Sequence, residues 1–93
     1  MAFELKWSHE ALEDIESIAT YIEKDSPLYA KAVVSKFFEK VKILQVNPHL
    51  GRKVPEVNSE NIREIFVYSY RLIYSVHSEE ILVVAVVHGK RLL

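Results

Sequence analysis

The apolar residues of this chain change their spacing once, and that change limits the fold more than any other feature. Between residues 8 and 47 they recur every three or four positions, which is the period of an amphipathic helix. After residue 61 they fall in short runs of strand length. Helices followed by consecutive strands are typical of the α+β class.

One short strand and two helices are expected in the first half. Residues 3–7 alternate apolar and polar side chains, as a half-buried strand does. Ser8 is a good N-cap for a helix over residues 8–24. Pro27 suits the first turn of a second helix, which should end at Asn47 and Pro48. The short link between them predicts an αα-hairpin.

Three strands are predicted in the second half, at about Ile62–Val67, Tyr70–Val76 and Ile81–His88, with links of hairpin length. The order β-α-α-β-β-β predicts one domain over residues 1–93, with two helices on one face of an antiparallel sheet. Ile81–Val87 is apolar at both alternating sets of positions, which favours a strand covered on both faces. The loop over residues 48–61, a partner chain, or both should therefore cover the second face.

Composition excludes several classes of protein. Without cysteine, the chain can form neither disulfides nor thiolate metal sites. Its histidines lack paired ligand spacing and no phosphate-binding glycine motif is present, so no metal and no cofactor are predicted. Nothing near residue 1 resembles a signal peptide and no apolar run could span a bilayer, so a cytoplasmic location is expected. A net charge of −1 indicates no strong field for polyanions.

Basic and aromatic residues gather in the second half, and Arg71 is the least expected because it lies inside a predicted strand. Because side chains alternate along a strand, Arg71 and Tyr74 lie on different faces of the sheet. The face that carries Tyr74 is the more apolar one and should pack against the helices. Arg71 is then expected on the open face, so that Arg71→Ala leaves folding nearly intact. It could stabilise a phosphorane-like anion, contact nucleic acid or a partner's carboxylate, or pair internally with Glu64.

Six motifs occur in order along the chain: W-S-x-x-A, D-I-x-x-I-A-x-Y-I, N-P-x-L-G-R-x-V-P-E, I-R-E-I, Y-R-L-I-Y and V-V-H-G-K-R-L-L. Together they resemble the RelE/ParE superfamily of toxins from type II toxin–antitoxin modules. The resemblance implies the β-α-α-β-β-β fold and a small cognate antitoxin. The amphipathic segment of that antitoxin should lie over the helical hairpin and the sheet.

The superfamily has two activities, and the resemblance favours one of them here. RelE-like members cut mRNA in the ribosomal A site with several cationic side chains. Two of these have counterparts in this sequence, namely Arg71 and Arg91. RelE-like members carry two further lysines on the preceding strand, and these positions hold Ile62 and Glu64 in this sequence. Arg63 lies one position away and therefore on the other face of the strand. A C-terminal tyrosine found in some members has no counterpart before Leu93.

The loop motif and the H-G-x-R-L-L ending look more like ParE-type sequences. They favour a non-enzymatic toxin that poisons DNA gyrase and halts replication. The alternative is a RelE-like ribosome-dependent mRNA interferase with Arg71, Arg91 and His88 or Arg52 as catalytic candidates. A third reading is a chain that has lost its toxicity and still holds its antitoxin. The residues expected to bind target or partner are Arg52, Lys53, Arg63, Arg71, Tyr74, His88, Lys90 and Arg91.

Overall fold

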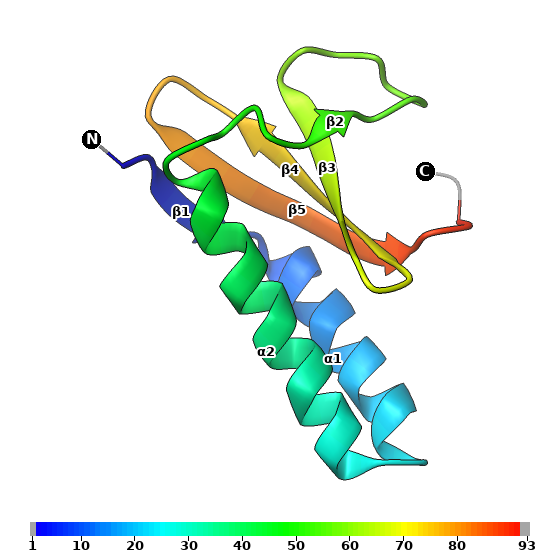
Figure 1. Ribbon diagram of the computed structural model, residues 1–93. Coiled ribbons are helices and arrows are strands. Elements are labelled where there is room, and N and C mark those ends of the chain that lie inside the picture. Colours follow the sequence, from blue (N-terminus) through cyan, green and yellow to red (C-terminus); the bar gives the residue numbers. More distant parts are fainter. Residues whose placement is uncertain (1, 92–93) are drawn as a thin grey trace.

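The computed structural model describes residues 2–91, which form one five-stranded sheet and a helical hairpin (Figure 1). Leu92 and Leu93, the last residues of the final motif, lie outside the described residues. The predicted order of elements is confirmed, and a two-residue strand is added inside the loop. The elements are β1 (Glu4–Trp7), α1 (His9–Glu23), α2 (Pro27–Leu44), β2 (Arg52–Lys53), β3 (Ile62–Val67), β4 (Tyr70–Val76) and β5 (Glu80–His88).

The helices begin where the capping residues predict. The Ser8 hydroxyl accepts a hydrogen bond from Ala11 N at 3.0 Å, and the Ser26 hydroxyl accepts one from Tyr29 N at 3.1 Å. Each cap satisfies a backbone N–H that has no partner within its helix. The hairpin extends beyond the sheet, so that its closing turn lies away from the strands (Figure 1). No helix in residues 2–91 is long and apolar enough to cross a membrane.

The sheet is mixed, which differs from the expected antiparallel sheet. Its strand order is β1-β5-β4-β3-β2, with β1 parallel to β5 and every other pair antiparallel. The two helices carry the chain from β1 at one edge of the sheet to β2 at the other edge, and β3 and β4 then lead back to β5 beside β1. A bulge at Val84 interrupts the pairing of β4 with β5. Beyond β1, the carboxylate of Asp14 accepts a hydrogen bond from Val86 N at 2.9 Å and thereby occupies the open edge of β5.

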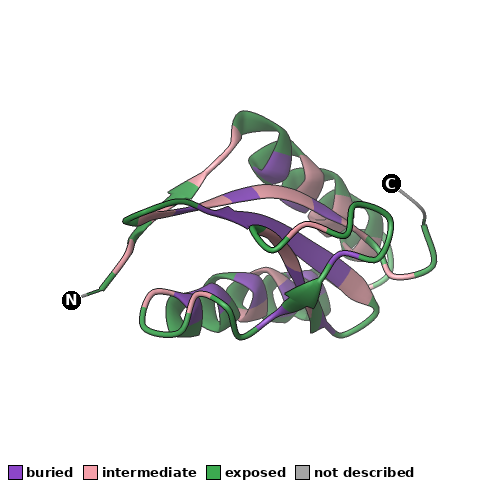
Figure 2. Cartoon of the chain, turned by 90° about the horizontal axis from the view of Figure 1, so that it is seen from above, coloured by how far each residue is buried: buried purple, intermediate pink, exposed green. Residues whose placement is uncertain are grey.

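The core lies between the helical hairpin and one face of the sheet, where buried residues gather (Figure 2). Phe37 from α2 packs with Leu72, Val83 and Val86 from the central strands. The loop over residues 48–61 covers part of the opposite face, where Val54 is buried. The sequence had predicted that this loop, a partner chain, or both would cover this face.

Some apolar residues on that opposite face stay partly open. Leu82, Ala85 and Val87 of β5 pair across the sheet with Ser75, Ile73 and Arg71, so they share the face that points away from the helices. All three are half-buried, whereas Ser75, Ile73 and Arg71 are buried. The loop therefore covers β4 more completely than β5.

Candidate functional site

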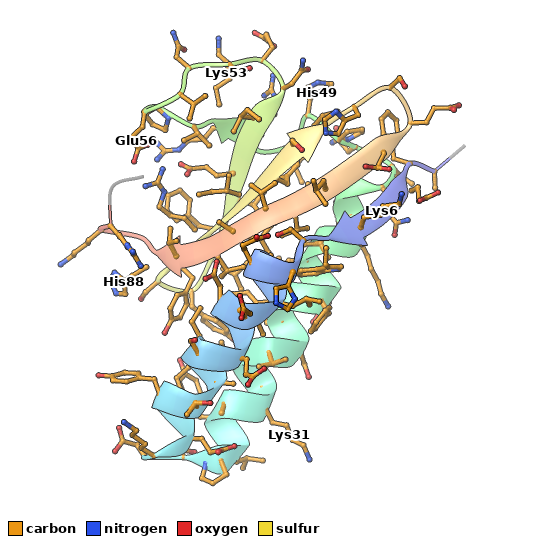
Figure 3. All side chains as sticks on the ribbon, turned by 180° about the vertical axis from the view of Figure 1, so that it is seen from behind. Lys6, Lys31, His49, Lys53, Glu56 and His88 are labelled. Carbon is orange, nitrogen blue, oxygen red and sulfur yellow. The ribbon has the colours of Figure 1, made fainter. Side chains whose placement is uncertain are left out.

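Arg71 lies on the predicted face of β4, yet the expectation that it is open to solvent is wrong. Its side chain is only 4% exposed. Nε donates to Glu64 Oε1 at 2.7 Å, while Nη1 and Nη2 donate to the two carboxylate oxygens of Glu56 at 2.9 and 2.8 Å. Nη1 also donates to the carbonyl oxygen of Arg91 at 2.8 Å. Glu56, which Figure 3 labels, lies in the turn after β2, and its carboxylate covers the guanidinium of Arg71.

Glu64 is the centre of this ion cluster. Its side chain is 0% exposed and also accepts a hydrogen bond from Arg52 Nε at 2.6 Å. Two guanidinium groups thus compensate a carboxylate that would be costly to bury alone. Hydrogen bonding to Glu56 raises the pKa of Arg71, so this guanidinium stays charged. The internal pair of Arg71 with Glu64, one of the alternatives from the sequence, is the arrangement found.

Tyr74 and Arg63 hold the loop that carries the N-P-x-L-G motif. The Tyr74 hydroxyl donates to Pro48 O at 2.8 Å and accepts from Gly51 N at 3.0 Å. Arg63 Nη1 donates to Gly51 O at 2.9 Å. Tyr74 is 0% exposed, so its predicted role as a residue that contacts a target or partner is wrong. Both the arginine and the second tyrosine of Y-R-L-I-Y therefore hold loops against the sheet.

We expect Tyr74→Phe to lower the free energy of unfolding at pH 7 by about 2 kcal/mol, because Gly51 N loses a buried acceptor. Burial raises the pKa of the Tyr74 phenol in the folded chain. Its stabilising contribution is therefore complete below the unfolded pKa of about 10 and is lost as pH rises through the folded value. Urea unfolding at pH 7 and from pH 9.5 to 11 tests this, and the variant should lose less stability over the alkaline range. Equal slopes for both proteins would contradict the assignment.

The remaining predicted cations do not join the Arg71 cluster. Lys53 Nζ lies 3.3 Å from Glu60, which also pairs with Arg63 at 2.9 Å. Lys53 and, to a smaller extent, Arg63 lower the pKa of Glu60. Lys90 is exposed at the end of β5. Within residues 2–91, no group of three or more histidine, aspartate or glutamate side chains is placed to hold a metal ion.

His88 lies outside the Arg71 cluster and lines a cleft of about 570 Å³ between α1 and the end of the sheet. Arg91 also lines this cleft, while its carbonyl oxygen is the one that binds Arg71. Figure 3 labels His88 at the end of β5. The tyrosine cleft, as we name it, is lined by Tyr21, Tyr29, Tyr68, Tyr70, His88 and Arg91, among others. Sequence reasoning missed the first three. One signal was available, because Tyr68 lies in a two-residue hairpin link, where asparagine and glycine are favoured.

Solved structures with the same fold include several toxins. The chain is 23% identical to a protein of the chromosomal ParDE toxin–antitoxin system from P. aeruginosa, with a TM-score of 0.78, and the match covers 96% of this chain and 98% of that one. A mutant of E. coli RelE in the free state is 20% identical, with a TM-score of 0.69 over 97% and 86% of the chains. The archaeal RelE–RelB complex from Pyrococcus horikoshii contains a chain that is 17% identical, with a TM-score of 0.67 over 99% and 100%.

A search of curated proteins found no match. A family model does match, and it describes the ParE toxin of the type II toxin–antitoxin system parDE. It covers residues 5–93, which is nearly the whole sequence, including the loop that Tyr74 holds and the strand that carries Arg71. The chain therefore belongs to the ParE toxin family of type II toxin–antitoxin systems.

Proposed function

We propose that this toxin inhibits DNA gyrase, traps its cleaved DNA complex and is neutralised by a cognate antitoxin. The observation that carries the proposal is that carboxylates of this chain already bind the guanidinium of Arg71. Its counterpart in the RelE-like resemblance must present a guanidinium to a phosphate. Here both carboxylate oxygens of Glu56 occupy the two terminal nitrogens, and Glu64 binds Nε.

The strand beside Arg71 also argues against phosphate chemistry at this place. The two positions that carry lysines in RelE-like members hold Ile62 and Glu64. The Glu64 carboxylate lies within 2.7 Å of the Arg71 guanidinium. A developing phosphorane would meet a negative charge where the mechanism needs donors, and losing a single such donor costs about 10²–10³ in rate. A role as a binding protein needs none of these donors.

A second candidate, the ribosome-dependent mRNA interferase, has one observation in its favour. Arg91 and His88, two of its catalytic candidates, both line the tyrosine cleft and are exposed. Histidine is the side chain that most often acts as a general acid or base. The other two candidates, Arg71 and Arg52, are held in the ion cluster by Glu56 and Glu64. The gyrase proposal is therefore the better supported one.

A supercoiling and cleavage assay with purified gyrase tests the proposal directly. The toxin should inhibit supercoiling and increase the amount of cleaved DNA at micromolar concentration. Adding the protein encoded by the neighbouring gene should restore supercoiling. That rescue is the control, because a contaminating nuclease would not respond to an antitoxin.

The opposite result is equally definite. No inhibition of gyrase, together with cuts at codon positions on translated mRNA in a primer-extension assay, would overturn the proposal and favour the interferase. The variants Arg91→Gln and His88→Gln should then reduce cleavage. Glu56→Gln should increase it, because Arg71 would lose its ionic partner at two of its nitrogens.

A further inference from the structure

The tyrosine cleft has the composition of a protein-binding surface. Four tyrosines reach it from four different elements: Tyr21 from α1, Tyr29 from α2, Tyr68 from the β3–β4 turn and Tyr70 from β4. Tyr21 is 70% exposed and Tyr68 is 54% exposed. Tyrosine offers a large rigid contact area with little loss of side-chain entropy, and with arginine it is enriched where binding energy concentrates.

Tyr68 has a backbone conformation that folding alone does not favour. Its φ is +53°, in the left-handed region, where a side chain as bulky as tyrosine is rare. The two-residue turn between β3 and β4 would be easier to form with asparagine or glycine. Burial does not compensate the cost, because more than half of the side chain is exposed and its ring lies 6.4 Å from that of Tyr29. Strain of this kind is typical of functional positions.

The charges around the cleft favour a polypeptide over a nucleic acid. Apart from His9, the charged residues of α1 are five carboxylates with no lysine or arginine, and one of them, Asp14, lines the cleft. This helix therefore brings negative charge to the cleft, which would repel phosphates. His88 and Arg91 provide positive charge at the other end of the cleft. The carboxylate of Asp14, which also lines the cleft, already accepts a hydrogen bond from Val86 N. Arg91 is therefore available for an acidic side chain of a partner.

We propose that the tyrosine cleft binds a segment of the cognate antitoxin, with an apolar side chain between the tyrosine rings and a carboxylate against Arg91. This inference rests on the proposed toxin–antitoxin partnership and adds the place and chemistry of one contact. The complementary charges select the occupant. A segment with an apolar anchor and an acidic residue matches both the rings and the cationic end, whereas DNA matches only the cationic end.

Tyr68→Asn is the sharpest test, because asparagine suits the left-handed backbone and removes only the ring. The probe is the purified product of the reading frame next to the toxin gene, and its affinity for the full chain is measured by calorimetry. We expect about a 10- to 30-fold loss of affinity, as for an aromatic residue at the centre of an interface. The thermal midpoint of the variant should be unchanged or higher. Val57→Asn, a substitution at a 48% exposed residue of the turn after β2, is the matched control and should bind normally.

Salt dependence tests the ionic half of the inference. Affinity should fall as salt rises from 50 to 500 mM, and the fall should be smaller for Arg91→Gln. The backbone carbonyl of Arg91, which binds Arg71, is retained in this variant. Equal salt dependence of the two proteins would exclude the carboxylate contact.

Three outcomes would overturn the inference, and they can be told apart. If the neighbouring protein does not bind the unaltered chain, the proposed partnership itself fails. If it binds the unaltered chain and Tyr68→Asn equally, only the placement at the cleft fails. If Tyr68→Asn binds antitoxin normally and no longer inhibits gyrase, the cleft belongs to the target and not to the antitoxin.

Discussion

Arg71→Ala is expected to lower the free energy of unfolding by about 3–5 kcal/mol, which is the usual cost of removing one partner from a buried ion pair. The loss arises because Glu64 is fully buried and would keep only Arg52, whose side chain is 57% exposed, as a cationic partner. Glu56 would lose both of its bonds to the guanidinium. The Arg91 carbonyl would lose its donor as well.

Urea unfolding followed by circular dichroism measures this effect, with two comparison variants. Arg52→Gln removes the exposed cation of the same cluster and should cost about 1 kcal/mol or less. Arg71→Leu combined with Glu64→Leu removes both buried charges and should recover much of the loss, because apolar replacements of a buried pair are often neutral. A cost below 1 kcal/mol for Arg71→Ala would mean that solvent reaches Glu64 and that Arg71 lies on an open face, as the sequence alone had predicted for the arginine.

The fold follows from the sequence because its signals are local. The serine caps, the proline at the start of α2 and the change of period after residue 47 each act over a few residues. Predicted and observed bounds of β3 and β4 agree. The parallel pairing of β1 with β5 and the two-residue β2 were missed, because strand order and very short pairings depend on contacts between distant segments.

The environment of Arg71 could not be read from its own strand. The alternation of side chains gives the correct face, but it says nothing about a covering turn. The cover comes from Glu56, which is 15 residues away in the sequence. The tyrosine cleft also depends on contacts between distant segments, because Tyr21, Tyr29 and Tyr68 meet only after the hairpin packs beside the sheet. Local pattern thus predicts elements, and long-range packing decides which charged residues remain accessible.

The motifs that carry the family resemblance divide between structure and surface. In Y-R-L-I-Y the arginine and the second tyrosine each hold part of the loop over residues 48–61. In N-P-x-L-G the proline carbonyl accepts a hydrogen bond from the hydroxyl of that tyrosine, and the glycine amide donates one to it. The first tyrosine of Y-R-L-I-Y and the histidine of H-G-K-R instead line the tyrosine cleft, with ring centres 5.9 Å apart. Sequence motifs alone therefore do not separate residues that stabilise this toxin from residues that bind.

Gly51→Ala is expected to destabilise the chain by about 3 kcal/mol, at the upper end of the usual cost of overpacking. The reason is space and not backbone conformation, because no described glycine has a positive φ. An added Cβ would lie 2.5 Å from Glu64 O and 2.7 Å from the Tyr74 hydroxyl. The carbonyl belongs to β3 and the hydroxyl is fixed by Pro48 O, so neither atom can move without breaking a hydrogen bond.

Gly89→Ala is the matched control, because it adds the same methyl group at the end of β5. There a Cβ would approach one oxygen, that of Ser69, at 2.8 Å, and the next contact is at 3.6 Å. Ser69 O accepts a hydrogen bond from Gly89 N at 2.6 Å, but the turn that carries Ser69 is exposed. A shift there disturbs this one exposed bond, so we expect a smaller loss, of about 1 kcal/mol. Urea unfolding of both variants at pH 7 gives the comparison. Equal losses would mean that the loop over residues 48–51 yields as easily as the β3–β4 turn, and that Tyr74 does not fix it.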